Sequence, residues 1–354
     1  MRRVTKKLLI FLLGVLFTFF YCEYLIYYVV VYQCAWPLVN TTNDNLKALI
    51  IADTHLLGPR KGHWLDKWRR EFQMQQAFTA IITAHNPDVV FVLGDLFDEG
   101  EWSSERQFEA YAARFFNLFS VPSNTSMYVV AGNHDIGFHN FIRRNSAERF
   151  VKLLHAPAVQ FLTLKGNNFV LINSMAMEGD NCELCTEARS YIDDIPKKLN
   201  TSNVESNVSQ PILMQHFPLY RVSDAACTEP DAPPLPERNK PFRSRIDALS
   251  KESTLYLVSK IKPRAVFGGH THHGCLIHHS YEDLKSNFFE YSVPSFSWRN
   301  RSDPKYMLVT IAPFVYAVNK CGLPQEPTII LTAIVLIFIL IYFLMRRKSI
   351  GRGY

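Results

Sequence analysis

The chain has 354 residues, enough for one large or two small domains, and its hydrophobic fraction of 48% permits a real core. The formal net charge is +6, but eight of the 38 Lys and Arg residues lie at the two chain ends, outside two long apolar runs. Without these eight and without Glu23, 30 basic residues face 31 acidic ones, so the body of the chain is nearly neutral. It carries no basic stripe, which argues against nucleic acid as a partner.

The N-terminal end combines a basic tail at residues 1–7 with an apolar run at 8–32 that is long enough to cross a bilayer. The run is too long for the hydrophobic part of a signal peptide, and no small-residue cleavage site follows Leu16. We therefore expect a retained transmembrane helix. Glu23 is its one charged residue, tolerable near an end of the span or against another helix.

A second apolar run at residues 328–345 is nearly free of polar groups and predicts another transmembrane helix. Basic clusters flank the outer ends of both runs, which places the tails 1–7 and 346–354 in the cytosol and the body in a lumen or outside the cell. In this interpretation residues 33–46 are a luminal linker and residues 313–327 a luminal tether.

Two features of the body suit that side of a membrane. Five Asn-x-Ser/Thr sequons are candidate glycosylation sites: Asn40, Asn124, Asn200, Asn207 and Asn300. Six of the seven cysteines also lie between the runs and can pair in an oxidising lumen, although sequence does not fix their connectivity: Cys34, Cys182, Cys185, Cys227, Cys275 and Cys321. Because no second Cys-x-x-Cys pair is present, disulfide bonding of Cys182 and Cys185 is favoured over half of a zinc site.

The body alternates short apolar runs with amphipathic helical patterns, which predicts an α/β core with both sheet faces covered. Predicted strands lie at 46–53, 88–95, 127–131, 169–175, 211–217 and 264–270, and predicted helices at 64–84, 103–119 and 140–154. The late segments FFEYSVPS and YMLVTIAP have no helix pattern between them and predict a second, partly antiparallel sheet. Residues 178–209 and 221–243 are polar or rich in Pro and are expected to be irregular.

Five of these strands end in residues that bind metals. In chain order the strand ends carry Asp53 and His55, Asp95, Asn133 to Asp135, His216, and His270 with His272. Because ligands in open α/β sheets sit beyond the carboxyl ends of the strands, we expect these side chains to meet at one edge. We also expect Gly94, Gly132, Gly268 and Gly269 to allow sharp turns there.

Carboxylate, imidazole and amide ligands suit Mn, Fe or Zn better than calcium, which prefers sites made of oxygen alone. A pair of ions needs one bridging carboxylate and several further ligands each, and would activate a water and neutralise phosphate oxygens. The strand ends offer seven candidates: Asp53, His55, Asp95, Asn133, His216, His270 and His272.

The motifs Asp-x-His, Gly-Asp-x-x-Asp, Gly-Asn-His-Asp, a lone His and Gly-His-x-His, in this order, resemble those of the calcineurin-like metallophosphoesterase superfamily over about residues 47–312. The resemblance implies a two-sheet sandwich flanked by helices and a site for two divalent metal ions. It also implies a division of the ligands: Asp53, His55 and His272 on one metal, Asn133, His216 and His270 on the other, and Asp95 bridging.

His134 matches a family histidine that is not expected to bind metal. It can protonate the leaving oxygen as the catalytic acid, and Asp135 can orient the loop or His134.

Two membrane anchors around one luminal domain, with the GDLFDEG, GNHDIGFH and GGHTHHG sequences, resemble a narrower group of this superfamily that acts on glycosylphosphatidylinositol (GPI) anchors. This resemblance implies removal of an ethanolamine-phosphate side branch from a mannose of GPI, with Mn favoured. It implies the early secretory pathway (ER exit sites, the ER–Golgi intermediate compartment and the cis-Golgi) and support for the transport of GPI-anchored proteins. The C-terminal tail is a candidate contact for cytosolic coat or cargo adaptors.

Four residues are candidates for binding the substrate. Asp98 and Glu99 offer negative charge for its ammonium group, with solvated turn residues or orientation of a metal ligand as the alternative. His139 and His273 lie close in sequence to the motifs and are candidates to line the pocket. Two other functions stay open: a luminal nucleotide or general phosphodiesterase, and a catalytically dead metal-dependent binding module.

Overall fold

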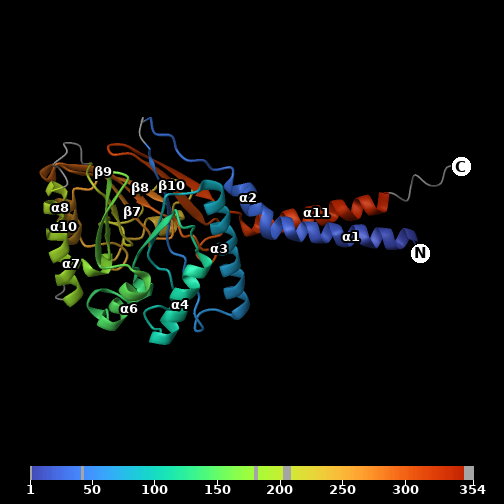
Figure 1. The fold of residues 1–354 in the computed structure, drawn as a ribbon, viewed down its shortest axis with the longest axis horizontal. Helices are drawn as coiled ribbons and strands as arrows, with labels where there is room; N and C mark the ends of the chain where they lie inside the picture. Colours follow the sequence, from blue (N-terminus) through green and yellow to red (C-terminus); the bar gives the residue numbers. More distant parts are fainter. Residues whose placement is uncertain (1, 41–43, 179–181, 202–208, 347–354) are drawn as a thin grey trace.

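The computed structural model describes residues 2–40, 44–178, 182–201 and 209–346. Two mixed β-sheets form a sandwich with helices on the outside (Figure 1). The five-stranded sheet has the order β11-β10-β1-β2-β3, with β1 (Leu46–Ile51), β2 (Val89–Leu93), β3 (Ser126–Val130), β10 (Lys305–Ile311) and β11 (Tyr316–Gly322). The six-stranded sheet has the order β4-β5-β6-β7-β9-β8, with β4 (Val159–Leu164), β5 (Asn167–Ile172), β6 (Ile212–Met214), β7 (Ala265–Gly268), β8 (Cys275–Tyr281) and β9 (Ser286–Ser292).

The continuous apolar runs become central strands because both of their faces are buried. In β1, Ala48 and Ile50 belong to a core cluster that spans both sheets, whereas Leu49 and Ile51 pack in the cluster that holds the helices. This alternation follows from the two-residue period of a strand. The helices of the domain are α3 (Trp64–His85), α4 (Glu105–Leu118), α5 (Asn133–Ile136), α6 (Arg144–Leu154), α7 (Glu183–Asp193), α8 (Ile195–Thr201), α9 (Leu235–Arg238) and α10 (Lys251–Ile261), with 3-10 turns at His139–Phe141, Ser174–Ala176 and Glu282–Leu284.

Both predicted membrane spans are helices. The first consists of α1 (Arg2–Phe20), a π-helical turn (Tyr21–Leu25) and α2 (Ile26–Val31), and the second is α11 (Glu326–Arg346). Windows within them have mean hydropathies of 2.1 and 2.9 and are mostly unburied, as expected for segments that face lipid. The two helices lie side by side and leave the domain at the same end (Figure 1), and Lys7 Nζ donates to Leu344 O at 2.7 Å.

The first span is docked on the domain by a set of contacts that we call the membrane junction. Glu23 pairs with Arg69 of α3, and Arg70 of the same helix lies 2.7 Å from Glu326 at the start of α11. The fully buried Tyr27 packs edge-on against Trp298, with ring centroids 6.2 Å apart. A disulfide between Cys34 and Cys321 closes the junction. The other two disulfides in the described residues are Cys182–Cys185 and Cys227–Cys275.

Two expectations about irregular segments are wrong. Residues 178–209 contain α7 and α8, because Cys185, Ala188 and Ile192 form a helical apolar stripe that is buried on the domain. The segment 313–327 is not a plain tether, because β11 pairs with β10 over seven residues and extends the domain past residue 312. The half-buried, partly polar pattern of β11 is typical of an edge strand and gives a weak sequence signal.

Candidate metal centre

The seven predicted ligands gather at one edge of the sandwich, at the carboxyl ends of β1, β2, β3, β6 and β7. Their donor atoms form two groups that share one carboxylate: Asp53, His55, Asp95 and His272 in the first, and Asp95, His216 and His270 in the second, with all donors of a group within 4.8 Å of one another. Asn133 joins the second group, because its Oδ1 lies 3.2 Å from His216 Nε2. The grouping coincides with the predicted division, while ligation itself stays a prediction.

Asp95 occupies the position that a bridging ligand needs. Its Oδ2 lies 3.5 Å from His55 Nε2 and 3.3 Å from His216 Nε2, and its Oδ1 accepts a hydrogen bond from the backbone N–H of His134 at 2.8 Å. His55 Nε2 and His272 Nε2 lie 3.1 Å apart, so the ring nitrogens of two candidate ligands converge on one place. This donor set fits two divalent cations of the borderline class.

Hydrogen bonds on the far side of the rings fix which nitrogen faces the centre. His216 Nδ1 lies 2.8 Å from Leu93 O, and His270 Nε2 lies 2.8 Å from Ile246 O. Carbonyl oxygens accept only, so each of these nitrogens carries a proton and the other ring nitrogen faces the centre. Such partners orient metal-binding histidines in proteins generally.

The site holds more buried negative charge than its own positive groups can neutralise. Burial raises the pKa of Asp53 well above its ordinary value, and the neighbouring Asp95 carboxylate adds to this. Burial lowers the pKa of His216, but Asp95 outweighs it and brings that pKa to about 9. Two fully buried carboxylates thus compete for the charge of one imidazolium, and divalent cations would relieve this conflict.

The backbone of the site is strained at most of the candidate ligands. Five of the seven candidate ligands have positive φ, in the left-handed region that side chains with a Cβ rarely adopt: Asp53 (54°), His55 (43°), Asp95 (49°), His270 (72°) and His272 (61°). Residues held in this region cluster at functional sites, where the surrounding structure compensates for the strain. The strand ends therefore turn abruptly, and the ligand side chains point across the edge of the sheet.

The glycines next to the ligands matter mainly for close approach, not for turning. Of the four that we expected to turn the chain, only Gly94 has positive φ, at 82°. A Cβ on Gly132 would lie 2.2 Å from the backbone N of Asp95, and one on Gly269 would lie 2.8 Å from Asp53 Oδ2. Any larger residue at these positions would displace the carboxylates.

Comparison with known proteins agrees with this geometry. A model of the calcineurin-like phosphoesterase family matches residues 46–274, which hold all seven candidate ligands. The chain belongs to this family. Proteins called Metallophosphoesterase 1 are similar to this chain over most of their length. The Ailuropoda melanoleuca protein is 44% identical over 329 residues, which cover 88% of this chain and 82% of the relative. The Danio rerio protein is 42% identical over 351 residues (94% of this chain, 91% of the relative), and the Mus musculus protein is 42% identical over 361 residues (95% of this chain, 89% of the relative).

As a calcineurin-like phosphoesterase, the chain is a metal-dependent enzyme, and the predicted acid His134 lies beside the candidate ligand His55. Its ring packs edge-on against that of His55, with centroids 4.8 Å apart, and about a third of the side chain is exposed. Among the described residues, no hydrogen bond or ion pair joins the Asp135 carboxylate to this ring. Its carboxylate accepts the backbone N–H groups of Gly132 and Phe97, at 2.9 and 3.0 Å, so that it fixes the loop rather than His134.

Of the two candidates for ammonium binding, Asp98 is engaged inside the site. Its Oδ1 lies 3.2 Å from His55 Nδ1 and 3.7 Å from His134 Nδ1. Burial raises the pKa of Asp98, but the hydrogen bond with His55 outweighs it and brings the pKa to about 2. Its geometry is that of a residue that orients a metal ligand, which was the alternative interpretation.

Glu99 is also engaged, and it is 3% exposed. Its carboxylate accepts the backbone N–H groups of Arg60 and Lys61, at 3.2 and 2.6 Å, and holds the loop after β1. His139 is buried, with both ring nitrogens against the carbonyls of Met175 and Arg245, whereas His273 lines a cavity beside His270. Of the two histidines predicted to line the pocket, only His273 borders this cavity.

Sequence analysis missed a supporting segment at residues 295–301. Ser295 Oγ donates to Asp53 O at 2.7 Å, Asn300 Nδ2 donates to Ser295 Oγ at 3.0 Å, and Arg301 donates to His272 O at 3.0 Å. This segment lies far from the motifs along the chain and carries no signal of its own. Because the Asn300 amide is engaged in the site, this sequon is a poor glycan acceptor, whereas Asn40 and Asn124 are exposed.

Proposed function

We propose that this enzyme is a two-metal phosphodiesterase that removes an ethanolamine-phosphate side branch from a mannose of GPI anchors. Its domain would face the lumen of the early secretory pathway, and Mn is the expected metal. The observation that carries the proposal is the combination of the metal centre with two membrane helices that leave one end of the domain together (Figure 1). Such a domain stays near the bilayer, where a lipid-linked glycan is held. Similarity to proteins called Metallophosphoesterase 1 supports the same assignment.

The covalent and surface features support a luminal domain. Three disulfides connect six cysteines of the body, and such bonds persist in oxidising compartments. Asn40 and Asn124 are exposed sequons, while Asn207 and the tail 347–354, the candidate contact for coat or cargo adaptors, lie outside the described residues.

A cavity of about 440 Å³ beside His270 suits a zwitterionic substrate. Its lining holds both signs of charge, from Asp224, Glu237, Lys240, Arg243 and Asp247. Asp224 and Asp247 are each bound by an arginine at 2.8 Å, whereas Glu237 is exposed and makes no ion pair among the described residues. Glu237 would therefore receive the substrate's ammonium, in place of Asp98 and Glu99.

In the proposed reaction a water oxygen forms a bond to phosphorus, and the bond from phosphorus to the mannose oxygen breaks. His134 gives its proton to that leaving oxygen, so the products are ethanolamine phosphate and a free mannose hydroxyl. Two divalent ions, when bound, would activate the water and neutralise the phosphate oxygens. Asp98 orients His55.

The test is release of ethanolamine phosphate from a GPI glycan by the full chain in detergent with Mn, beside His134→Ala and Asp95→Asn. Release that both substitutions abolish supports the proposal. Cleavage of a generic aryl phosphodiester or of a nucleotide diester, without release from the glycan, would keep the mechanism and overturn the substrate. Metal binding without any hydrolysis would indicate a binding module.

A further inference from the structure

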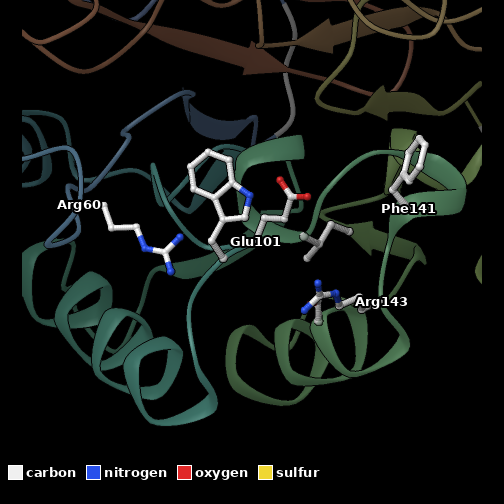
Figure 2. A pocket seen from close by; sticks show the side chains of 7 residues that line it. Arg60, Glu101, Phe141 and Arg143 are labelled. Carbon is white, nitrogen blue, oxygen red and sulfur yellow. The ribbon is translucent and has the colours of Figure 1, made fainter.

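A second cavity, of about 590 Å³, adjoins the loop that carries His134. Figure 2 shows Arg60 and Arg143 on opposite sides of it, with Glu101 between them. The lining comes from three stretches of the chain: the loop after β1, the turn before α4, and the stretch from the end of α5 into α6. We call this space the Trp102 cavity, after the indole that forms part of its wall.

A short chain of contacts connects the Trp102 cavity to the reaction centre. Lys61 Nζ lies 4.8 Å from the centre of the Trp102 ring and 3.5 Å from Asp98 Oδ2. The other oxygen of Asp98 lies 3.7 Å from His134 Nδ1. The backbone N–H of Glu101 also donates to the carbonyl of His134 at 2.9 Å. The cavity therefore adjoins the loop of His134, the proposed acid for the leaving oxygen.

The lining residues have unused binding capacity. Arg60 and Arg143 are exposed, and neither side chain forms an ion pair with a described residue. Trp102 is 48% exposed and Phe141 is 78% exposed, although both are large and apolar. Aromatic faces next to guanidinium groups suit a ligand that has both a flat, weakly polar surface and an anionic group.

We propose that the Trp102 cavity is the subsite for the leaving group, and that it binds a phosphorylated sugar chain. Trp102 stacks on a sugar ring, Glu101 accepts sugar hydroxyl groups, and Arg60 with Arg143 binds a phosphate carried elsewhere on the same sugar chain. This inference rests on the proposed function, since it names what stays attached to the mannose oxygen after cleavage. A nucleotide is the alternative ligand and is tested as a competitor.

The subsite is tested by competition. The full chain in detergent with Mn hydrolyses an aryl phosphodiester, and the inhibition constants of phosphorylated mannotriose, neutral mannotriose and inorganic phosphate are compared. Arg60→Ala and Arg143→Ala should each raise the inhibition constant of phosphorylated mannotriose about tenfold, as expected for loss of one charge-assisted contact, and change that of inorganic phosphate far less. Trp102→Ala should raise the inhibition constants of both mannotrioses, and Trp102→Phe should restore most of the binding.

Arg106→Ala is the matched control, because Arg106 is exposed on the nearby α4 but does not line the cavity. It should leave every constant unchanged. Equal inhibition by phosphorylated mannotriose in the wild type and in both arginine variants would overturn the subsite, as would arginine-dependent inhibition by nucleotides alone.

Failure of the subsite can be told apart from failure of the proposed function. If the wild type releases no ethanolamine phosphate from a GPI glycan, but phosphorylated mannotriose still inhibits in an arginine-dependent manner, the function fails and the subsite stands. If release occurs with the same KM in wild type, Arg143→Ala and Trp102→Ala, the function stands and the subsite fails.

Discussion

The metal centre and the membrane junction use charged side chains in opposite ways. At the metal centre, Asp53 and Asp95 are buried close together on strained backbone, and the one imidazolium of His216 cannot neutralise both without bound cations. At the membrane junction, Glu23 and Glu326 each meet an arginine of α3, and a disulfide closes the contact. The first region is organised for chemistry at some cost in stability, and the second for stability alone. Substitutions should therefore separate turnover from stability.

The largest effect on turnover is expected at His134. His134→Ala should lower kcat by about 10²- to 10⁴-fold, because general acid catalysis contributes that much. The thermal midpoint should stay within a few degrees of the wild type, since the ring is a third exposed and is not a predicted ligand. Steady-state kinetics and a melting curve on the same preparation check this. Unchanged kcat would remove His134 from the reaction.

The largest effect on stability is expected at the junction. Loss of the disulfide in Cys34→Ser/Cys321→Ser should lower the free energy of unfolding by about 2–4 kcal/mol, because the bond joins segments 287 residues apart. Turnover of an aryl phosphodiester at low temperature should change less than twofold. Chemical denaturation measures the first quantity. If the double variant loses turnover while it stays folded, the two regions are coupled, and the junction does not serve stability alone.

A smaller effect is expected where a residue acts through a metal ligand. Asp98→Asn should weaken metal binding by about 10- to 100-fold, as is usual for the partner of a ligating histidine. The residue lies 3.2 Å from His55 Nδ1, and the amide keeps its shape but loses its charge. Metal titration followed by calorimetry is the readout, and excess metal should recover most of the turnover. Tight binding in the variant would show that His55 needs no such partner.

The same contrast explains what sequence could predict. The ligands sit within a few residues of apolar strands, so the strand pattern and the motif together located all seven at one edge. The junction depends on single residues such as Tyr27 and Trp298, which meet only in the folded chain and form no local pattern. The segment 295–301 and the Trp102 cavity were missed for the same reason. β11 was missed because an edge strand needs no continuous apolar run.

The smallest predicted effect is a pH dependence at His85, close to the linker that follows the first span. His85 is 7% exposed, its Nε2 lies 3.1 Å from the Tyr306 hydroxyl, and the Trp36 indole donates to its carbonyl at 3.0 Å. Burial lowers the pKa of His85 below its ordinary value. Between that lowered pKa and the value of about 6.5 in the unfolded chain, the unfolded state binds the extra proton.

The contribution of His85 to stability is therefore complete above about pH 6.5 and is lost as the pH falls toward the folded pKa. His85→Gln keeps a hydrogen-bonding side chain but does not titrate. Between pH 7.5 and 5, the unfolding free energy of the wild type should fall relative to that of this variant. Denaturation at both pH values measures it, and taking the difference removes the histidines of the metal centre, which titrate equally in both proteins. A constant difference would mean that His85 protonates as readily in the folded chain as in the unfolded one, and that the linker does not seal it from water.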